Sequence, residues 1–145
     1  MTLSELRQQI GQLFLVGFDG RTVPEDFKKA IQEFNLGGTI YFKRNAESPV
    51  QLAMLSNQLQ WECRSKESPQ LLISIDHEGG KVNRLSAPFT QFPGMDLVGE
   101  MGSPKLAFHV GLAMGEELSA IGVNVNFAPV ADVLTNRANP IMAGR

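Results

Sequence analysis

The chain has 145 residues, of which 43% are hydrophobic and 19% are charged, with a net charge of −2 and a single cysteine. These values are typical of a folded globular protein and exclude a disordered, collagen-like or disulfide-rich chain. Lys and Arg are scattered, which argues against a nucleic-acid partner, and no apolar run is long enough to span a membrane.

The first third of the chain predicts two helices, each followed by a strand. A T-x-x-E capping box at Thr2 begins a short helix, and an apolar strand follows at residues 13–16. Pro24 opens a second helix, in which apolar residues repeat at helical spacing up to Asn35. The β-rich segment 39–42 follows a glycine pair and is predicted to be the second strand.

The next part repeats the same alternation. Ser48 begins a helix with a leucine stripe, and the apolar segment 71–75 is predicted to be a strand buried on both faces. A long loop is expected from residue 76 to about residue 102, and Ser103 opens the next helix. Period-2 alternation predicts a fourth strand at residues 123–127. The expected buried face of the last helix consists of Leu106, Val110, Ala113, Leu118 and Ile121.

Alternating strands and helices favour a parallel sheet with crossover helices. Two architectures fit this order: an open, doubly wound sheet and a closed barrel. The glycine fingerprint G-x-G-x-x-G is missing after the first predicted strand, which disfavours the dinucleotide-binding version of the open sheet. Residues 128–145 are rich in Pro, Asn and Ala and are predicted to form a loop.

The sequence D-H-E-G-G-K-V-N-R begins directly after the third strand and runs from Asp76 to Arg84. In an α/β barrel the carboxyl ends of the strands form the active-site face. Asp76 is placed there to accept hydrogen bonds from sugar hydroxyls, and Arg84 to donate to oxygens. A purely structural Asp76–Arg84 salt bridge fits the spacing equally well. A catalytic pair of Asp76 and Glu78 is disfavoured, because residues i and i+2 do not easily flank a substrate.

Other polar residues carry weaker signals. His77 is expected to be a hydrogen-bonded loop residue, and His109 has no ligating residue at i+3 or i+4, so no metal site is predicted. Asp132 follows the fourth strand and could be catalytic, although a role in holding the loop through backbone amides is favoured. Cys63 lies in a helical stretch and is expected to pack in the interior.

Several stretches together resemble the N-terminal part of a glycoside hydrolase family 3 barrel of the β-N-acetylhexosaminidase type. The D-x-E-G-G-x-V-x-R and F-A-P-V-x-D-V patterns are the most specific. The resemblance implies that residues 1–145 form the N-terminal half of a (β/α)8 TIM-type barrel, with outer helices. The matching stretches are Gly11-Gln12-Leu13, Gly37-Gly38-Thr39-Ile40, Phe42-Lys43-Arg44-Asn45, residues 75–84, Phe92-Pro93, Glu117-Leu118, Ile121-Gly122-Val123-Asn124 and residues 127–133.

By this resemblance, Asp76 and Arg84 bind a terminal N-acetylglucosamine. Arg145, at the end of an N-P-x-x-x-G-R stretch, matches a further sugar-contacting arginine. The family usually has Gln where this chain has His77. Its acid/base histidine lies in a Lys-His-Phe-Pro-Gly-His-Gly stretch beyond the fourth strand, and its Asp nucleophile lies later. Neither occurs in these 145 residues, so no catalytic residue is expected among them.

The resemblance therefore implies a retaining exo-β-N-acetylglucosaminidase that needs no metal or organic cofactor, acting on sugars derived from peptidoglycan or chitin. A family 3 β-glucosidase and a non-catalytic, sugar-binding half-barrel are the alternatives. A single cysteine and the lack of a signal-peptide pattern favour a cytoplasmic protein. Open edges of a half-barrel, with Ile73, Ile75 and Val125 or their neighbours uncovered, are expected to promote self-association.

Overall fold

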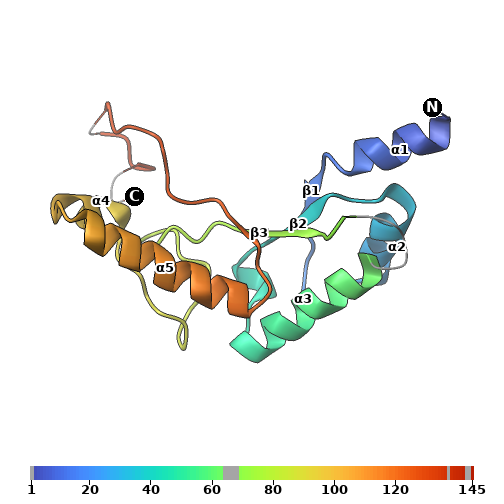
Figure 1. The fold of residues 1–145 in the computed structure, drawn as a ribbon, viewed down its shortest axis with the longest axis horizontal. Coiled ribbons are helices and arrows are strands. Elements are labelled where there is room, and N and C mark those ends of the chain that lie inside the picture. Colours follow the sequence, from blue (N-terminus) through green and yellow to red (C-terminus); the bar gives the residue numbers. More distant parts are fainter. Residues whose placement is uncertain (1, 64–68, 137, 143–144) are drawn as a thin grey trace.

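The computed structural model describes residues 2–63, 69–136, 138–142 and 145. Its four strands form one parallel sheet with the order β1-β2-β3-β4. Along the chain the elements are α1 (Leu3–Gly11), β1 (Leu15–Val16), α2 (Glu25–Phe34), β2 (Gly38–Tyr41), the 3-10 turn η1 (Lys43–Asn45), α3 (Pro49–Cys63), β3 (Leu72–Ile75), α4 (Met95–Glu100), α5 (Pro104–Ala120) and β4 (Val125–Asn126) (Figure 1).

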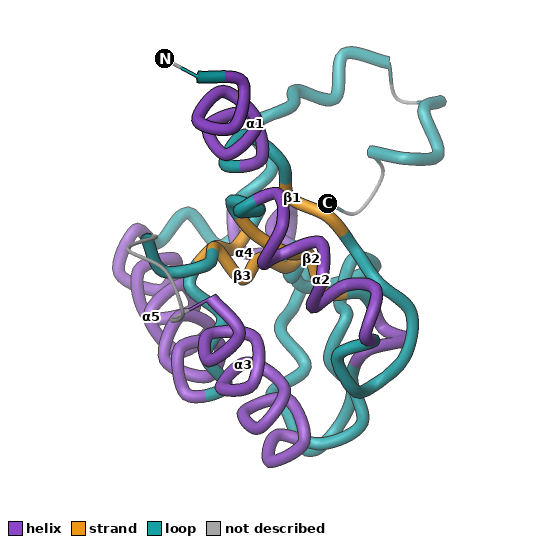
Figure 2. Tube along the Cα trace, turned by 90° about the vertical axis from the view of Figure 1, so that its right-hand side faces the viewer, coloured by secondary structure: helices purple, strands orange, loops and turns teal. Residues whose placement is uncertain are grey.

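The order of the strands distinguishes between the two architectures. Each strand pairs with the next one along the chain, whereas a doubly wound sheet reverses its strand order at a switch point. The crossover helices α3 and α5 lie on the same side of the sheet (Figures 1 and 2). This arrangement confirms the expected half of a barrel. Within the described residues the sheet does not close, and β1 and β4 are its edges.

Local capping signals fix the helix ends where the sequence predicts them. The side chain of Thr2 accepts a hydrogen bond from the Glu5 amide at 3.2 Å, and the Thr2 amide donates one to the Glu5 carboxylate at 2.7 Å, which completes the capping box. The helix α2 ends at Asn35, which adopts the left-handed conformation with φ 53°. Ser103 caps α5 by accepting from the Leu106 amide.

The hydrophobic core lies between the sheet and the helices. Ile73 and Ile75 of β3 are buried in one cluster with Leu52 and Leu59 of α3. Of the residues expected to be uncovered, Ile73 and Ile75 are instead buried, and the exposed one is their neighbour Leu72. Side chains alternate across a strand, so these two face the helices, while Leu72 faces the other side of the sheet and is 45% exposed. The uncovered inner surface of the half-barrel is thus at Leu72.

Two predictions differ from the structure at the edges and in the long loop. The edge strands β1 and β4 contain two paired residues each, fewer than the predicted 13–16 and 123–127, since each edge has a partner on one side only. The segment 76–102 is not entirely loop, because α4 covers Met95–Glu100. Its six residues are too few to show a helical apolar period, and Gly94 and Gly99 resemble loop residues.

The last crossover helix buries less of its apolar surface than predicted. Leu118 and Ile121 are buried as expected, but Leu106 is 38% exposed and Ala113 is also exposed. The inward-facing residues therefore belong mainly to the second half of α5, close to the sheet. No helix in the described part of the chain is both long and apolar enough to cross a membrane.

Candidate functional site

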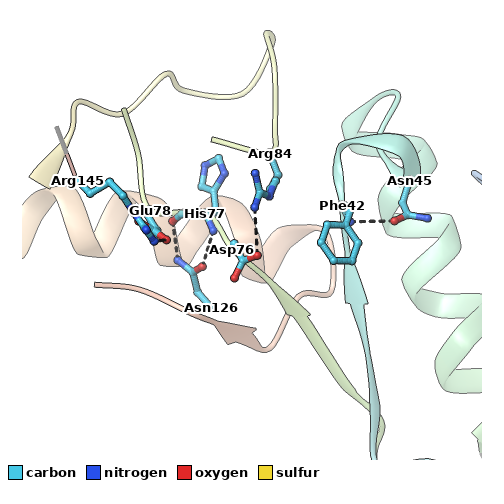
Figure 3. Close-up of polar contacts among 8 residues, drawn as sticks. All are labelled: Phe42, Asn45, Asp76, His77, Glu78, Arg84, Asn126 and Arg145. Atoms are coloured by element: carbon cyan, nitrogen blue, oxygen red, sulfur yellow. Dashed lines mark hydrogen bonds and ion pairs between the residues drawn. The ribbon is translucent and has the colours of Figure 1, made fainter. Parts of the chain in front are cut away.

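The candidate site lies where β3 ends. Asp76 directly follows the strand, and its Oδ2 is 3.2 Å from Nη2 of Arg84. Figure 3 shows the two side chains pointing toward each other. They are 28% and 30% exposed, so part of the pair is accessible from outside. The structure thus brings together the two residues predicted from the strand end and from the arginine beyond the glycine turn. Their placement on one face, at the carboxyl end of the strand, is confirmed.

A tight turn returns the chain so that Arg84 reaches Asp76. The Glu78 amide donates to the Val82 carbonyl at 2.9 Å, and the Val82 amide donates to the Gly79 carbonyl at 3.2 Å. Gly79 has φ +88°, and a Cβ atom there would lie 2.3 Å from the carbonyl oxygen of Pro93. The turn therefore requires glycine at this position for both its backbone conformation and its packing.

The guanidinium group of Arg84 retains donor capacity. Its Nη2 contacts Asp76, whereas its Nε is buried and has no hydrogen-bond partner among the described residues. A buried N–H group without a partner is costly, and such groups usually bind water or a ligand. The arginine can therefore hold Asp76 and still donate to another oxygen.

A second ion pair lies beside the first. Arg145 Nε is 2.9 Å from Oε2 of Glu78, and its Nη2 makes a shorter contact with Oε1 (Figure 3). The Glu78 side chain is 6% exposed and that of Arg145 is 21% exposed. Hydrogen bonding to Glu78 raises the pKa of Arg145, and the charges of Asp132 and Asp76 raise it further. Arg145 therefore contacts Glu78 and not Asp76, although the pairs are neighbours.

These contacts also bear on whether Asp76 and Glu78 could act together as a catalytic carboxylate pair. Asp76 and Glu78 are each bound to a different arginine, so neither is a free carboxylate facing the other. Two adjacent acid–arginine pairs at one strand end instead offer forked N–H donors beside carboxylate oxygens. This is a suitable surface for a ligand rich in hydroxyl and carbonyl oxygens.

His77, between the two acids, is buried and is 1% exposed. Its ring lies edge-on to Phe92, with 6.0 Å between centroids, and its Nδ1 has no partner among the described residues. No group of three potential metal-ligating residues occurs in the part of the chain that the structure describes. His109 uses its Nδ1 to contact the carbonyl of Lys105 within its own helix, at 2.7 Å.

Burial also makes His77 a pH-sensitive element of the fold. Desolvation lowers the pKa of His77 below its ordinary value of 6.5, and the charge of Glu117 opposes this in part. The unfolded chain therefore binds a proton at higher pH than the folded chain. Stability from the neutral ring is fully present above about pH 6.5 and is lost as the pH falls toward the lowered folded pKa.

We expect His77→Gln to flatten this pH dependence, because Gln does not titrate. The measurement is urea unfolding at several pH values between 7.5 and 5. The free energy of unfolding should depend more steeply on pH for the wild type than for the variant. The difference in slope should be at most that of one proton, about 1.4 kcal/mol per pH unit. His109→Gln, which removes the other histidine from an exposed position, is the control. Identical slopes for wild type and His77→Gln would contradict the expectation.

Asn126 contacts the site but was missed in the sequence. It lies in β4, and its side chain binds both backbone groups of His77. The period-2 pattern of Asn124 and Asn126 predicts a strand, but it does not indicate a contact with the site. Asp132 was expected to hold the following loop, yet it is exposed and accepts no hydrogen bond among the described residues. Asn136 and Asn139 do so instead, each accepting from a backbone amide two residues later at 3.0 Å.

Comparison with known proteins identifies relatives. The Glycosyl hydrolase family 3 N terminal domain matches residues 5–145. Beta-hexosaminidase A of Pseudoalteromonas piscicida is 38% identical over 127 residues, which are 83% of this chain and 21% of that protein. Beta-hexosaminidase of Nitrosomonas eutropha is 38% identical over 120 residues, 79% of this chain and 33% of that protein. The chain thus spans a third or less of these two relatives.

Solved structures give the same result. A glycoside hydrolase family 3 beta-N-acetylglucosaminidase from Paenibacillus sp. superposes with a TM-score of 0.90 and 42% identity, over 97% of this chain and 26% of that one. NagZ from Neisseria gonorrhoeae, in complex with N-trifluoroacetyl-D-glucosamine, superposes with a TM-score of 0.74 and 31% identity, over 82% of this chain and 36% of that one. From this match of sequence and fold, the chain belongs to glycosyl hydrolase family 3.

Proposed function

We propose that these residues are part of a retaining β-N-acetylhexosaminidase that removes terminal β-linked N-acetylglucosamine. The partly exposed Asp76–Arg84 pair at the carboxyl end of β3 carries the proposal. The names of the relatives support the substrate class, as does the glucosamine derivative in the NagZ structure. Peptidoglycan-derived or chitin-derived sugars are the proposed natural substrates.

In this proposal Asp76, Arg84 and Arg145 hold the sugar. A carboxylate has more acceptor sites than one arginine contact uses, so Asp76 can still accept from a hydroxyl group. The buried Nε of Arg84 supplies a donor to a sugar oxygen. Arg145 lies at the next pair, where its fork is held by Glu78. Positioning of this kind lowers the barrier by fixing the reacting bond in place.

The chemical step needs groups that we place beyond residue 145. Retention requires a nucleophile on one face of the anomeric carbon and a proton donor on the other. The acids at the end of β3 are both bound to arginine, which suits them to binding and not to these two roles. We assign the nucleophile and the acid/base group to the later part of the barrel, and we invoke no cofactor.

The test is substrate preference, measured on a polypeptide that carries these residues together with the rest of the barrel. We expect kcat/KM for 4-nitrophenyl β-N-acetylglucosaminide to exceed that for the β-glucoside by at least about 10²-fold, because a site built to bind a polar group rejects analogues without it. NMR should show the β-anomer as the first product. The reverse preference would indicate a β-glucosidase, and binding of N-acetylglucosamine without turnover would indicate a non-catalytic module.

We further propose that an isolated 145-residue chain self-associates. Within the described residues β1 and β4 are edges with one partner each, and such edges invite pairing with another chain. Large apolar side chains are exposed near both edges, including Leu13 and Phe14 just before β1 and Phe127 just after β4. Light scattering that shows a compact monomer over a wide concentration range would exclude this proposal.

A cytoplasmic location is also part of the proposal. Cys63 is the only cysteine, so the 145 residues can form no internal disulfide. Its thiol is buried and lies 3.7 Å from the carbonyl oxygen of Pro69, and burial raises its pKa. A protonated, packed thiol of this kind suits a reducing compartment.

A further inference from the structure

One side chain from the neighbouring strand holds the peptide at the centre of the candidate site. Oδ1 of Asn126 accepts a hydrogen bond from the His77 amide at 3.0 Å, and its Nδ2 donates to the His77 carbonyl at 2.9 Å (Figure 3). The same Nδ2 lies 3.3 Å from the sulfur of Met114 in α5, which packs against the amide. Both backbone groups of His77 are thereby tied to β4.

The position of this clamp decides which residues it orients. His77 lies between Asp76 and Glu78, whose side chains bind Arg84 and Arg145 respectively. Fixing both ends of the His77 residue fixes the backbone from which these two acids project. A side chain held by a rigid backbone keeps its rotamer and loses less freedom when a ligand binds. Asn126 therefore acts on both ion pairs while contacting neither.

The buried ring of His77 does not duplicate the clamp. Its Nδ1 has no hydrogen-bond partner among the described residues, and its contact with Phe92 is an edge-on ring contact. The backbone bonds on either side of His77 run from the Phe127 amide to the Ile75 carbonyl and from the Glu78 amide to the Val82 carbonyl. The His77 peptide between them is thus held by the Asn126 side chain.

We infer that Asn126 is a positioning residue for sugar binding, setting the direction of the Asp76–Arg84 and Glu78–Arg145 pairs by clamping the His77 peptide. This inference rests on the proposed function for the substrate, but the clamp itself can be tested without it. Loss of the clamp should weaken the alignment of both arginines without removing either side chain.

The chain offers a matched control two residues away. Asn124 accepts from the Ile73 amide at 2.8 Å and donates to the Leu71 carbonyl at 3.0 Å. It therefore makes two similar bonds to the backbone at the opposite end of the same strand, away from the acids. Asn124→Ala and Asn126→Ala each remove two side-chain bonds to β3 and its flanks, so a purely structural role predicts similar effects for both.

The kinetic experiment uses the complete barrel and 4-nitrophenyl β-N-acetylglucosaminide. We expect Asn126→Ala to lower kcat/KM by roughly 10- to 100-fold, because small misplacements of binding groups have effects of this size. Asn124→Ala should remain within about twofold of wild type, since its clamp lies outside the site. Asn126→Asp is isosteric and keeps the acceptor for the His77 amide, so it tests the lost donor if Asn126→Ala does not fold. Equal losses for the two alanine variants would overturn the inference.

Amide hydrogen exchange, measured without substrate, separates the clamp from the proposed function. Asn126→Ala should accelerate exchange at the Glu78 and Val82 amides of the turn, whereas Asn124→Ala should act at Ile73. If the wild-type barrel does not cleave the β-N-acetylglucosaminide, the proposed function is wrong. The hydrogen-exchange measurement is then the only test of the clamp. Unchanged exchange at Glu78 and Val82 in Asn126→Ala would overturn the inference in either case.

Discussion

A polypeptide that ends at Arg145 should show no measurable hydrolysis of 4-nitrophenyl β-N-acetylglucosaminide, whereas one that includes the remaining strands of the barrel should cleave it. Cleavage with retention needs a nucleophile and a proton donor, and we propose that both lie in barrel strands beyond residue 145. Groups that only bind the sugar accelerate little unless they act more strongly in the transition state. Removal of a catalytic unit lowers the rate on the order of 10⁴- to 10⁶-fold, so hydrolysis by the short chain should be too slow to detect.

The opposite result would have one structural explanation. Asp76 and Glu78 would have to form a working acid–nucleophile pair, and turnover by the 145-residue chain would then disappear in Asp76→Ala or Glu78→Gln. The geometry argues against this. Glu78 is buried and holds Arg145 in a bidentate contact, and Asp76 holds Arg84, so neither carboxylate is free to attack or to donate a proton. Binding of the sugar without turnover is the result we expect of the short chain.

The fold was largely predictable because its signals are local. Strand and helix alternate with clear apolar periods, and capping residues such as Thr2, Ser103 and Asn35 mark helix ends within a few residues. These signals do not depend on how the elements pack. The strand lengths do, since a residue belongs to a ladder only if the neighbouring strand offers a partner. The predicted positions of β1 and β4 were therefore right and their extents too long.

Burial was harder to predict than secondary structure. Alternation in β3 separates Ile73 and Ile75 from Leu72, but sequence alone does not say which set faces the helices. The prediction therefore allows either the isoleucines or their neighbours to be uncovered, and the structure shows the isoleucines in the core and Leu72 exposed. The face of α5 illustrates the same limit, because Leu106 has the right period for a buried residue and is nevertheless partly exposed. An apolar period predicts which residues share one face of a helix or strand, but it does not predict which element packs against that face.

The contacts of the site also divide into local ones, which the sequence predicts, and long-range ones, which it does not. Asp76 and Arg84 are eight residues apart and joined by a glycine turn, so their meeting at the strand end could be predicted from local sequence. Asn126 reaches His77 across 49 residues, and Arg145 reaches Glu78 across 67. Contacts of that kind depend on strand register and on the path of a long loop. The sequence showed Glu78 as an acid of no clear role, and only the fold reveals that it holds Arg145.

Asp76→Asn should have the largest effect of any single substitution in the described site, when it is made in the complete barrel. The amide keeps the shape of the side chain but loses its charge and part of its acceptor capacity. A hydrogen bond to a charged group contributes about 1.5–3 kcal/mol, so two such bonds to a sugar correspond to a loss of kcat/KM on the order of 10²- to 10⁴-fold. The measurement is steady-state hydrolysis of 4-nitrophenyl β-N-acetylglucosaminide.

The matched control is Asp19→Asn, which alters another acid–arginine pair in the loop that follows β1. Asp19 binds Arg44, but its side chain is 90% exposed and we assign it no role in the site, so kcat/KM should stay near that of wild type. If Asp76 instead only anchors Arg84, Asp76→Asn should cost stability, up to about 1 kcal/mol for a partly exposed pair, and leave kcat/KM unchanged. Urea unfolding of both variants separates these outcomes. If Asp76 binds the sugar, its substitution lowers kcat/KM; if Asp76 is a structural anchor, its substitution lowers the free energy of unfolding.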